Sequence, residues 1–131
     1  MAIAITPFLM FQGDGTEALD FYLATFPDSR LDQIERYGAG EPGPEGQIKR
    51  ARFTVGGQSV LCFDSPVTHA FAFTPSFSFW IECSSEDEVR RLAETLKAGG
   101  SELMPLGDYG FSKRFAWVSD RFGVSWQINH A

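Results

Sequence analysis

The order of predicted elements is the same in both halves of this 131-residue chain, and the duplication limits the fold more than any other feature. Each half reads as a strand, a helix and then three strands. The repeat is also visible in the residues: segments 52–60 and 114–124 both begin with Arg-Phe, run apolar, turn and resume with alternating apolar side chains. A repeated βαβββ unit predicts an α+β fold built from two similar modules of roughly sixty residues.

The final hairpin is the best-defined part of the second module. Residues 115–118 form one apolar run, and residues 124–128 alternate apolar and polar side chains. Residues 120–123 lie between them and carry the Asp and Gly that suit a tight turn. Because side chains alternate along a strand, Trp126 and Gln127 are predicted to lie on opposite faces of the sheet.

Capping residues, prolines and glycines indicate where the other elements begin and end. Thr16 is the expected N-cap of the first helix, which ends at Pro27. Ser85 and Glu88 form a capping box for the second helix, which Gly99–Gly100 ends. The other predicted strands cover residues 3–11, 31–37, 48–55, 59–64, 77–83 and 101–105, with a primed turn at Gly56–Gly57.

We expect a single domain of residues 1–131, made of modules 1–66 and 75–131 that a connector, residues 67–74, joins. The connector carries Phe71 and Phe73. Two Phe would be unusual in a solvated loop, so we expect this segment to pack on something. Together with strand edges that need covering, these two side chains predict a homodimer.

Composition excludes several partners. Seventeen acidic against eleven basic residues give a net charge of −6, which repels nucleic acid and anionic membranes. No apolar stretch approaches the ~20 residues that a bilayer span needs, and we expect a cytoplasmic protein. Thirteen Phe indicate a large core, an apolar pocket or an apolar interface.

The two cysteines, Cys62 and Cys83, lie in apolar strand-like runs. We expect buried, reduced thiols that act as small apolar fillers and form no disulfide framework. A reactive thiol at Cys83, which precedes a helix start, is the alternative.

Four segments carry a resemblance to a known family: residues 5–9, 18–22, 104–108 and, above all, 120–129 (DRFGVSWQIN). The chain resembles the vicinal-oxygen-chelate superfamily, which includes glyoxalases, extradiol dioxygenases, and bleomycin- and fosfomycin-resistance proteins. Within it, the chain is similar to the PhnB-like, or demethylubiquinone methyltransferase-like, family. The resemblance implies curled mixed sheets with cup-shaped clefts, dimers with packed or exchanged modules, and a divalent metal held by His and Glu.

The residues at the implied metal positions are poor ligands. The resemblance places these positions at or near Pro7, residues 62–64, Ser76 or Ser78, and Gln127. They offer the Asp64 carboxylate and the Gln127 amide, whereas a divalent ion needs three or more converging imidazole or carboxylate groups. His69 lies in the connector, and His130 lies at the C-terminus, where we expect it to be exposed. We therefore predict no bound metal and no cofactor.

A methyl-donor site normally needs a glycine-rich strand-to-helix turn on a parallel sheet, and residues 12–15 are too short to provide one. We instead predict a glyoxalase/bleomycin resistance-like protein that binds a small planar or apolar molecule in a metal-free cup. The alternative is a small-molecule enzyme of lyase, isomerase or dioxygenase type that uses a weakly held divalent metal.

The candidate ligand-binding residues combine stacking surfaces with polar groups. Lys113 and Arg114 could attract an anionic ligand, and Asp64 and Tyr109 are the candidates for proton transfer. Alternatively, the aromatic residues fill the layer between sheet and helix, and residues 109–114 form an ordinary solvated turn. The candidates are Asp64, Trp80, Tyr109, Lys113, Arg114, Trp117, Trp126 and Gln127.

Overall fold

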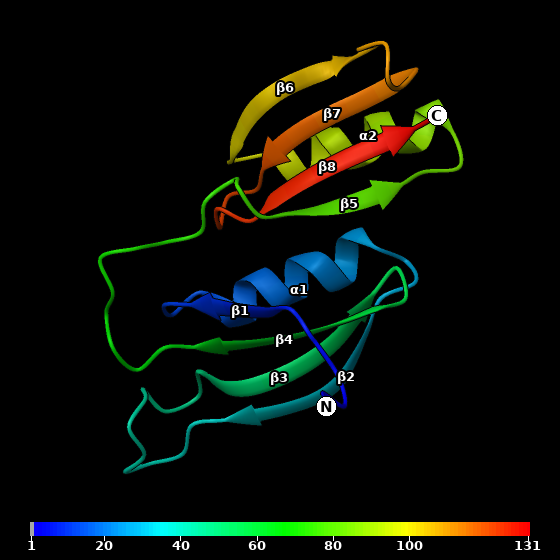
Figure 1. Ribbon diagram of the computed structural model, residues 1–131. Helices are drawn as coiled ribbons and strands as arrows, with labels where there is room; N and C mark the ends of the chain where they lie inside the picture. Colours follow the sequence, from blue (N-terminus) through cyan, green and yellow to red (C-terminus); the bar gives the residue numbers. More distant parts are fainter. Residues whose placement is uncertain (1) are drawn as a thin grey trace. The chain divides into compact units, whose positions relative to one another are not determined.

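A computed structural model describes residues 2–131, and the chain divides into two compact units between Ala70 and Phe71 (Figure 1). This boundary lies inside the predicted connector, residues 67–74. Each unit contains a strand, a helix and then three strands, so the predicted α+β fold of two βαβββ modules is confirmed. The arrangement of both modules in a single domain stays a prediction.

The first unit has a four-stranded mixed sheet with the order β1-β4-β3-β2. Strand β1 is parallel to β4, and the other neighbours are antiparallel. Gly56 and Gly57 join β3 to β4 with φ angles of 54° and 81°, which confirms the predicted primed turn. The elements are β1 (Phe8–Phe11), α1 (Gly15–Thr25), β2 (Arg30–Arg36), β3 (Ile48–Val55) and β4 (Gln58–Asp64).

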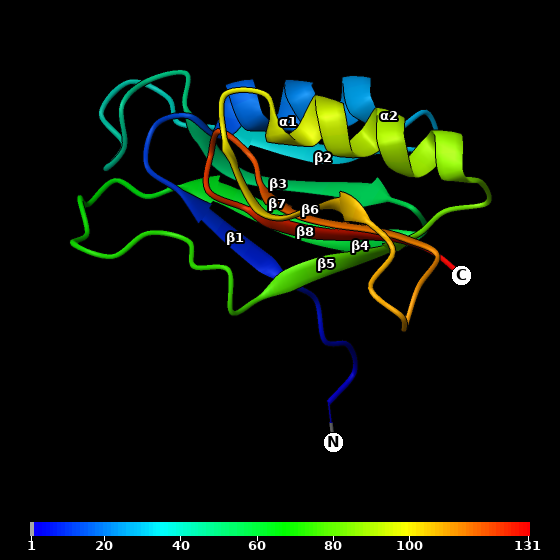
Figure 2. The same ribbon diagram turned by 90° about the horizontal axis from the view of Figure 1, so that it is seen from above.

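The second unit repeats this plan with the sheet order β5-β8-β7-β6, in which β5 is parallel to β8. In each unit the helix packs on one face of its own sheet, as Figures 1 and 2 show. No helix among residues 2–131 is long and apolar enough to span a membrane. The elements are β5 (Ser78–Glu82), α2 (Glu86–Lys97), β6 (Ser101–Gly107), β7 (Arg114–Ser119) and β8 (Ser125–His130).

Each core lies between a helix and the sheet face beneath it. In the first unit, Tyr22 of α1 stacks on Phe53 of β3 with ring centroids 6.2 Å apart, and both are buried. In the second, α2 buries the predicted apolar face of Val89, Leu92, Ala93 and Leu96. Burying such side chains is the main favourable contribution to folding.

The first strand is shorter than predicted. Strand β1 begins at Phe8, where pairing with Leu61 begins, and not at residue 3. Ile3 and Ile5 are 103% and 90% exposed, so their apolar character does not reflect burial in this unit. Period-two patterning indicates a strand only where a partner strand is present to pair with it.

The connector is only partly packed. Phe73 is half-buried and lies beside Gly123, whose ideal Cβ would be 3.5 Å from the Phe73 Cβ. Phe71 is 61% exposed.

The cap of the first helix was predicted wrongly. The N-cap is Asp14, which makes no side-chain capping bond, and Thr16 lies within the first turn. The Asp64 carboxylate at the end of β4 takes the capping role: its Oδ1 accepts from the backbone N–H of Gly13 (3.0 Å) and Gly15 (2.8 Å). Local pattern does not reveal this cap because the carboxylate comes from a distant part of the chain.

Asp64 also joins the helix to the sheet. Its Oδ2 accepts from the backbone N–H of Ile48 at 2.9 Å, and the residue is 1% exposed. A Cβ at Gly15 would lie 2.8 Å from Asp64 Oδ1, so only glycine allows this approach. A buried carboxylate is tolerated where donors satisfy it, as three backbone N–H groups do here.

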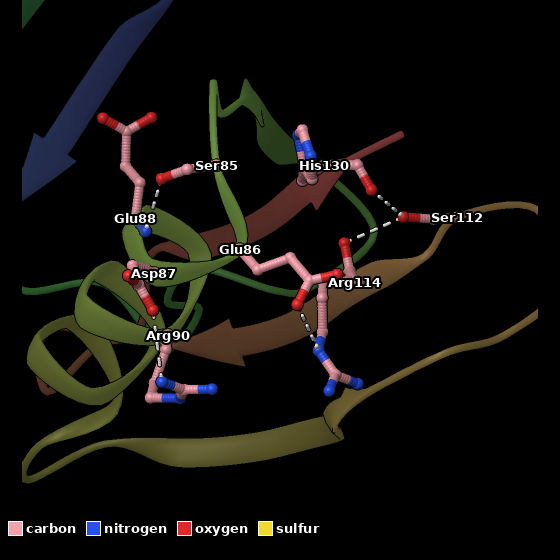
Figure 3. A network of polar contacts seen from close by, with 8 residues as sticks. All are labelled: Ser85, Glu86, Asp87, Glu88, Arg90, Ser112, Arg114 and His130. Atoms are coloured by element: carbon pink, nitrogen blue, oxygen red, sulfur yellow. Dashed lines mark hydrogen bonds and ion pairs between the residues drawn. The ribbon is translucent and has the colours of Figure 1, made fainter.

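The second helix has the predicted local cap. Ser85 Oγ accepts from the backbone N–H of Glu88 at 3.2 Å (Figure 3). The Glu88 carboxylate accepts from the backbone N–H of Ser84 at 3.0 Å, one residue before the cap itself. This capping interaction closely matches the prediction because all its partners are close in sequence.

The predicted turn between β7 and β8 is organised by a second buried carboxylate. Asp120 Oδ1 accepts from the backbone N–H of Phe122 (2.9 Å) and Val124 (3.1 Å), and Oδ2 accepts from Trp126 Nε1 (2.9 Å). Gly123 has a φ of 93°, which an L side chain rarely adopts.

Both cysteines are buried and free, as predicted. Burial raises the pKa of each thiol to about 12, with the Asp64 charge adding to the shift at Cys62 and Glu88 at Cys83. The alternative of a reactive thiol at Cys83 is therefore wrong, because the thiolate is the nucleophilic form.

We expect Asp64→Ala to destabilise the protein by at least about 3 kcal/mol, because it leaves buried backbone donors unsatisfied at ~1–3 kcal/mol each. Urea unfolding followed by circular dichroism measures the change. Asp87→Ala is the matched control, since the Asp87 side chain is 92% exposed and pairs with Arg90 at the surface, so its loss should cost under about 1 kcal/mol. Equal unfolding midpoints for the Asp64 and Asp87 variants would contradict the capping role.

Candidate functional site

Strand register divides the second sheet into two faces, because paired residues on neighbouring strands project to the same side. One face packs beneath α2 and carries Phe79, Ile81, Ala116, Val118, Trp126 and Ile128. We call the opposite side the open face. It carries Ser78, Trp80 and Glu82 of β5, Ser125, Gln127 and Asn129 of β8, Phe115, Trp117 and Ser119 of β7, and Met104 of β6.

The central row of the open face is Trp80, Gln127 and Trp117, which are in register on β5, β8 and β7. Neighbouring strands lie about 4.8 Å apart, so the Gln127 amide is flanked by two indoles. Trp80 is 50% exposed, and the other two are half-buried. The register thus brings together three predicted candidates that are separated in the sequence.

A chain of side-chain hydrogen bonds holds this row in place. Ser78 Oγ and Ser125 Oγ are 2.6 Å apart, and Trp117 Nε1 donates to Ser125 Oγ at 2.8 Å. Gln127 Nε2 donates to Ser78 Oγ at 3.2 Å. These contacts restrict the rotamers of the side chains that a ligand would meet, so little further ordering is needed on binding.

The next row carries a negative charge. The Glu82 carboxylate accepts from Trp80 Nε1 at 2.7 Å and from Asn129 Nδ2 at 3.1 Å. The hydrogen bond from Trp80, followed by the one from Asn129, lowers the pKa of Glu82. Glu82 is therefore ionised at neutral pH, at one end of the open face.

An aromatic cluster covers Phe115 in the same row. Phe115 is 2% exposed, and its ring centroid lies 5.7 Å from Trp80, 5.9 Å from Tyr109 and 5.0 Å from Phe111. Tyr109 and Phe111 come from the loop between β6 and β7 and are 36% and 64% exposed. The loop thus extends the apolar surface around Trp80.

Polar contacts anchor this loop to the ends of β7 and β8 (Figure 3). The Ser112 hydroxyl is the donor toward two carbonyl oxygens, that of Arg114 at 2.8 Å and that of His130 at 3.0 Å. His130 was predicted to be exposed, which is wrong: it is half-buried in β8, and its Nδ1 lies 3.1 Å from the Cys83 carbonyl oxygen. Pairing with β7 and β5 orders the chain to this point.

Arg114 lies on the α2 side of the sheet, where its Nε is 3.7 Å from Glu86 Oε2 (Figure 3). The Arg114 Nε is buried, and 3.7 Å is too long for a hydrogen bond, so the contact with Glu86 is an ion pair. Lys113 is exposed. The structure therefore holds Arg114 away from the open face.

Two other candidates, Asp64 and Trp126, are buried in the interior of their units. Asp64 is buried against three backbone N–H groups of the first unit. Trp126 is 2% exposed on the α2 side, stacked on Phe79 with centroids 4.9 Å apart. Sequence reasoning placed Trp126 and Gln127 on opposite faces, and the register confirms this.

Among the residues that the sequence reasoning missed are Glu82, Phe115 and Asn129 of the open face and Phe111 of the adjoining loop. Alternation from Gln127 could have identified Asn129, and alternation from Trp80 could have identified Glu82. Phe115 was treated only as part of an apolar run, and no pattern indicated that Phe111 would reach it.

The side chains at the implied metal positions do not fit a divalent ion. In β4, Cys62 and Asp64 project toward α1, while Leu61 and Phe63 occupy the opposite face. In the second unit, the Gln127 amide and Ser78 hydroxyl bond to each other. Residues 2–131 contain no group of three or more His, Cys, Asp or Glu side chains placed to hold a metal ion. Amide and hydroxyl groups alone are weak ligands for divalent ions such as Zn²⁺.

Two backbone donors in the turn before α1 are already used within the protein. The backbone N–H groups of Gly13 and Gly15 point at the Asp64 carboxylate. The start of α1 therefore does not offer these groups to a phosphate or to a methyl donor.

The architecture defines a class of protein. The fosfomycin resistance protein FosX from Listeria monocytogenes superposes with a TM-score of 0.69 at 13% identity, covering 100% of this chain and 94% of its own. This likeness shows the fold, which is that of the glyoxalase/bleomycin resistance proteins.

Residues 3–129 match the family described as 3-demethylubiquinone-9 3-methyltransferase, and the chain belongs to that PhnB-like family. The PhnB protein from Bacillus cereus is 46% identical, with a TM-score of 0.93 over 97% of this chain and 98% of its own. Protein PA1353 from Pseudomonas aeruginosa is 30% identical, with a TM-score of 0.84 over 98% of both chains. YjdN from Escherichia coli is 24% identical over 95% of this chain and 93% of its own.

We expect the purified protein to contain no stoichiometric divalent metal, because its amide and hydroxyl groups cannot replace imidazole and carboxylate ligands. Elemental analysis after dialysis against metal-free buffer measures this. The matched variant is Gln127→Glu with Ser78→His, which should raise the affinity for Zn²⁺ or Mn²⁺ if the positions are otherwise suitable. One equivalent of metal in the unaltered protein, lost in Gln127→Leu, would disprove the prediction.

Proposed function

We propose that the open face of the second unit binds a small planar or apolar molecule. The observation that carries the proposal is the row of Trp80, Gln127 and Trp117, with half of the Trp80 surface exposed. An indole is costly to leave in water and offers a flat surface for stacking. Aromatic walls with a few fixed polar groups are typical of small-molecule sites.

Binding is favoured over catalysis by the state of the polar groups. The Tyr109 hydroxyl donates to the carbonyl oxygen of Pro105, and the Glu82 carboxylate is held by Trp80 and Asn129. A general acid or base must exchange its proton with a bound substrate, and these bonds instead tie the groups to the protein. Methyl transfer, which the description of the family names, is not proposed for this chain, because the backbone donors of Gly13 and Gly15 are occupied by Asp64.

We expect Trp80→Ala to weaken the binding of flat aromatic fragments by about tenfold, the equivalent of ~1.4 kcal/mol of lost stacking and burial. Ligand-detected NMR on the full chain with indole as the probe measures the affinity. Phe77→Ala is the matched control: Phe77 is 57% exposed, precedes the same strand and contacts Phe79 of the α2 side. An equal loss in both variants, or no loss in Trp80→Ala, would count against the site.

We further propose that the protein is a homodimer. Strand β1 is an edge of its sheet, and the residues at and before it include Ile3, Ile5 and Phe8, with exposures of 103%, 90% and 57%. Exposed apolar side chains along an unpaired strand edge favour association with another chain. A second copy would supply a self-complementary partner.

Light scattering at micromolar concentration should give twice the 14.6 kDa mass of the chain. Ile5→Lys together with Phe8→Lys should shift the mass toward the monomer, because the charges oppose burial of the edge. Phe111→Lys is the control for an exposed aromatic residue elsewhere. A monomeric mass for the unaltered protein would disprove the proposal.

A further inference from the structure

Three solvent-exposed aromatic rings gather around Phe115 of the open face. Trp80, Tyr109 and Phe111 are 50%, 36% and 64% exposed. Their ring centroids lie 5.7, 5.9 and 5.0 Å from that of Phe115, which is itself 2% exposed. The three rings thus cover Phe115 and present their own outer surfaces to solvent. An exposed apolar patch of this kind is typical of a binding surface.

The loop that supplies two of these rings is held by its own contacts. The Tyr109 hydroxyl donates to the carbonyl oxygen of Pro105, and the backbone N–H of Gly110 donates to Asp108 Oδ1 at 2.9 Å. The rings of Tyr109 and Phe111 stack with centroids 6.2 Å apart. These contacts position the rings in the absence of a ligand, so little ordering has to accompany binding.

A carboxylate lies at the edge of the most central of these rings. Glu82 is exposed on the same side of β5 as Trp80, and one of its oxygens accepts from Trp80 Nε1 at 2.7 Å. A partner of the indole N–H lies close to the plane of the ring, so the carboxylate leaves the faces of the indole uncovered. An anion at this position also makes the indole richer in electrons, which strengthens its attraction for a cation on its face.

The negative charge of Glu82 is not compensated within the protein. Its two oxygens accept from Trp80 Nε1 and from Asn129 Nδ2, which are both neutral groups. None of the ion pairs among residues 2–131 includes Glu82. The Arg114 guanidinium, which the sequence placed nearby, is paired with Glu86 on the α2 side. The row therefore combines an exposed indole face with an unpaired carboxylate.

This combination favours a cation of a particular kind. An ammonium that carries methyl groups has a spread, weakly hydrated charge and an apolar surface, so it gains both from an aromatic face and from a nearby carboxylate. A bare ammonium is strongly hydrated and loses more free energy when it leaves water for an aromatic surface. A methylated ammonium also needs no hydrogen-bond acceptor, and both Glu82 oxygens already accept bonds.

We propose that the ligand of the open face carries a quaternary or other N-methylated ammonium group, which lies against Trp80 and is balanced by Glu82. The proposal rests on the proposed function and names the chemical class of the ligand. It reverses the sequence-based expectation of an anion attracted by Lys113 and Arg114. The net charge of −6 favours a cationic ligand in the same sense.

Three probes of similar size test this with the full chain: choline, its neutral analogue with carbon in place of nitrogen, and ethanolamine, which has the charge without the methyl groups. Affinities are measured by ligand-detected NMR at low ionic strength, because salt screens an exposed charge. Choline should bind at least about tenfold more tightly than either of the other two, the size of a cation–π contact supported by a carboxylate.

Two variants separate the carboxylate from the aromatic face. Glu82→Gln should weaken choline binding about tenfold and leave binding of the neutral analogue unchanged. Trp80→Leu keeps an apolar side chain but removes the indole, so it should reduce the preference for choline over the neutral analogue. Glu102→Gln is the matched control, because Glu102 pairs with Lys97 and is in register with Val118 of the α2 side.

The outcomes distinguish this proposal from the proposed function, for which indole is the probe. Equal or tighter binding of the neutral analogue or of ethanolamine overturns the ammonium proposal, as does unchanged choline binding in Glu82→Gln. Where indole still binds and depends on Trp80, the proposed function remains. No binding of choline, the neutral analogue or indole at millimolar concentration overturns both.

Discussion

The buried carboxylate of Asp64 is the interaction on which the first unit depends. It accepts backbone N–H bonds from Gly13 and Gly15 at the start of α1 and from Ile48 at the start of β3. The cost of removing a charge from water is met only because all three donors converge, and that convergence fixes the helix against the sheet. Gly15 has to be glycine for the same reason, since a Cβ would meet the carboxylate at 2.8 Å.

A buried carboxylate also organises the second unit, at the turn between β7 and β8. Asp120 is 2% exposed and accepts two backbone N–H groups of its own turn and the indole N–H of Trp126. This bond ties the β7–β8 turn to the face that packs beneath α2. In each unit, a buried carboxylate thus braces the side of the sheet that the helix covers.

This division explains why adjacent residues of β8 have different roles. Trp126 fills the core, and Gln127 lies between Trp80 and Trp117 on the open face. The Gln127 amide donates to the Ser78 hydroxyl, so a neutral pair stands at this point of the open face. The aromatic residues therefore follow both readings of the sequence: some fill the layer under the helix, and others form an exposed surface.

Local signals predicted the elements whose stabilising contacts are close in sequence. The capping of α2 by Ser85, the Gly56–Gly57 turn and the turn at Asp120 are all of this kind. The predictions that were wrong concern residues whose stabilising contacts are distant in the sequence. Thr16 was predicted to cap α1, whereas the start of this helix is held by Asp64, which is 49 residues from Gly15 in the sequence. His130 was expected to be exposed at the C-terminus, although pairing in the sheet orders it.

The amino-acid sequence by itself determined the duplicated βαβββ plan, the family resemblance and the opposite faces of Trp126 and Gln127, because these follow from periodicity and short-range chemistry. Only the tertiary structure decided which candidates share a face of the second sheet. It brought Trp80, Tyr109, Trp117 and Gln127 to one side and placed Asp64, Arg114 and Trp126 elsewhere. The physical reason is that strand register and buried hydrogen bonds join residues about fifty positions apart, as between Gly13 and Asp64, and no local pattern records such pairings.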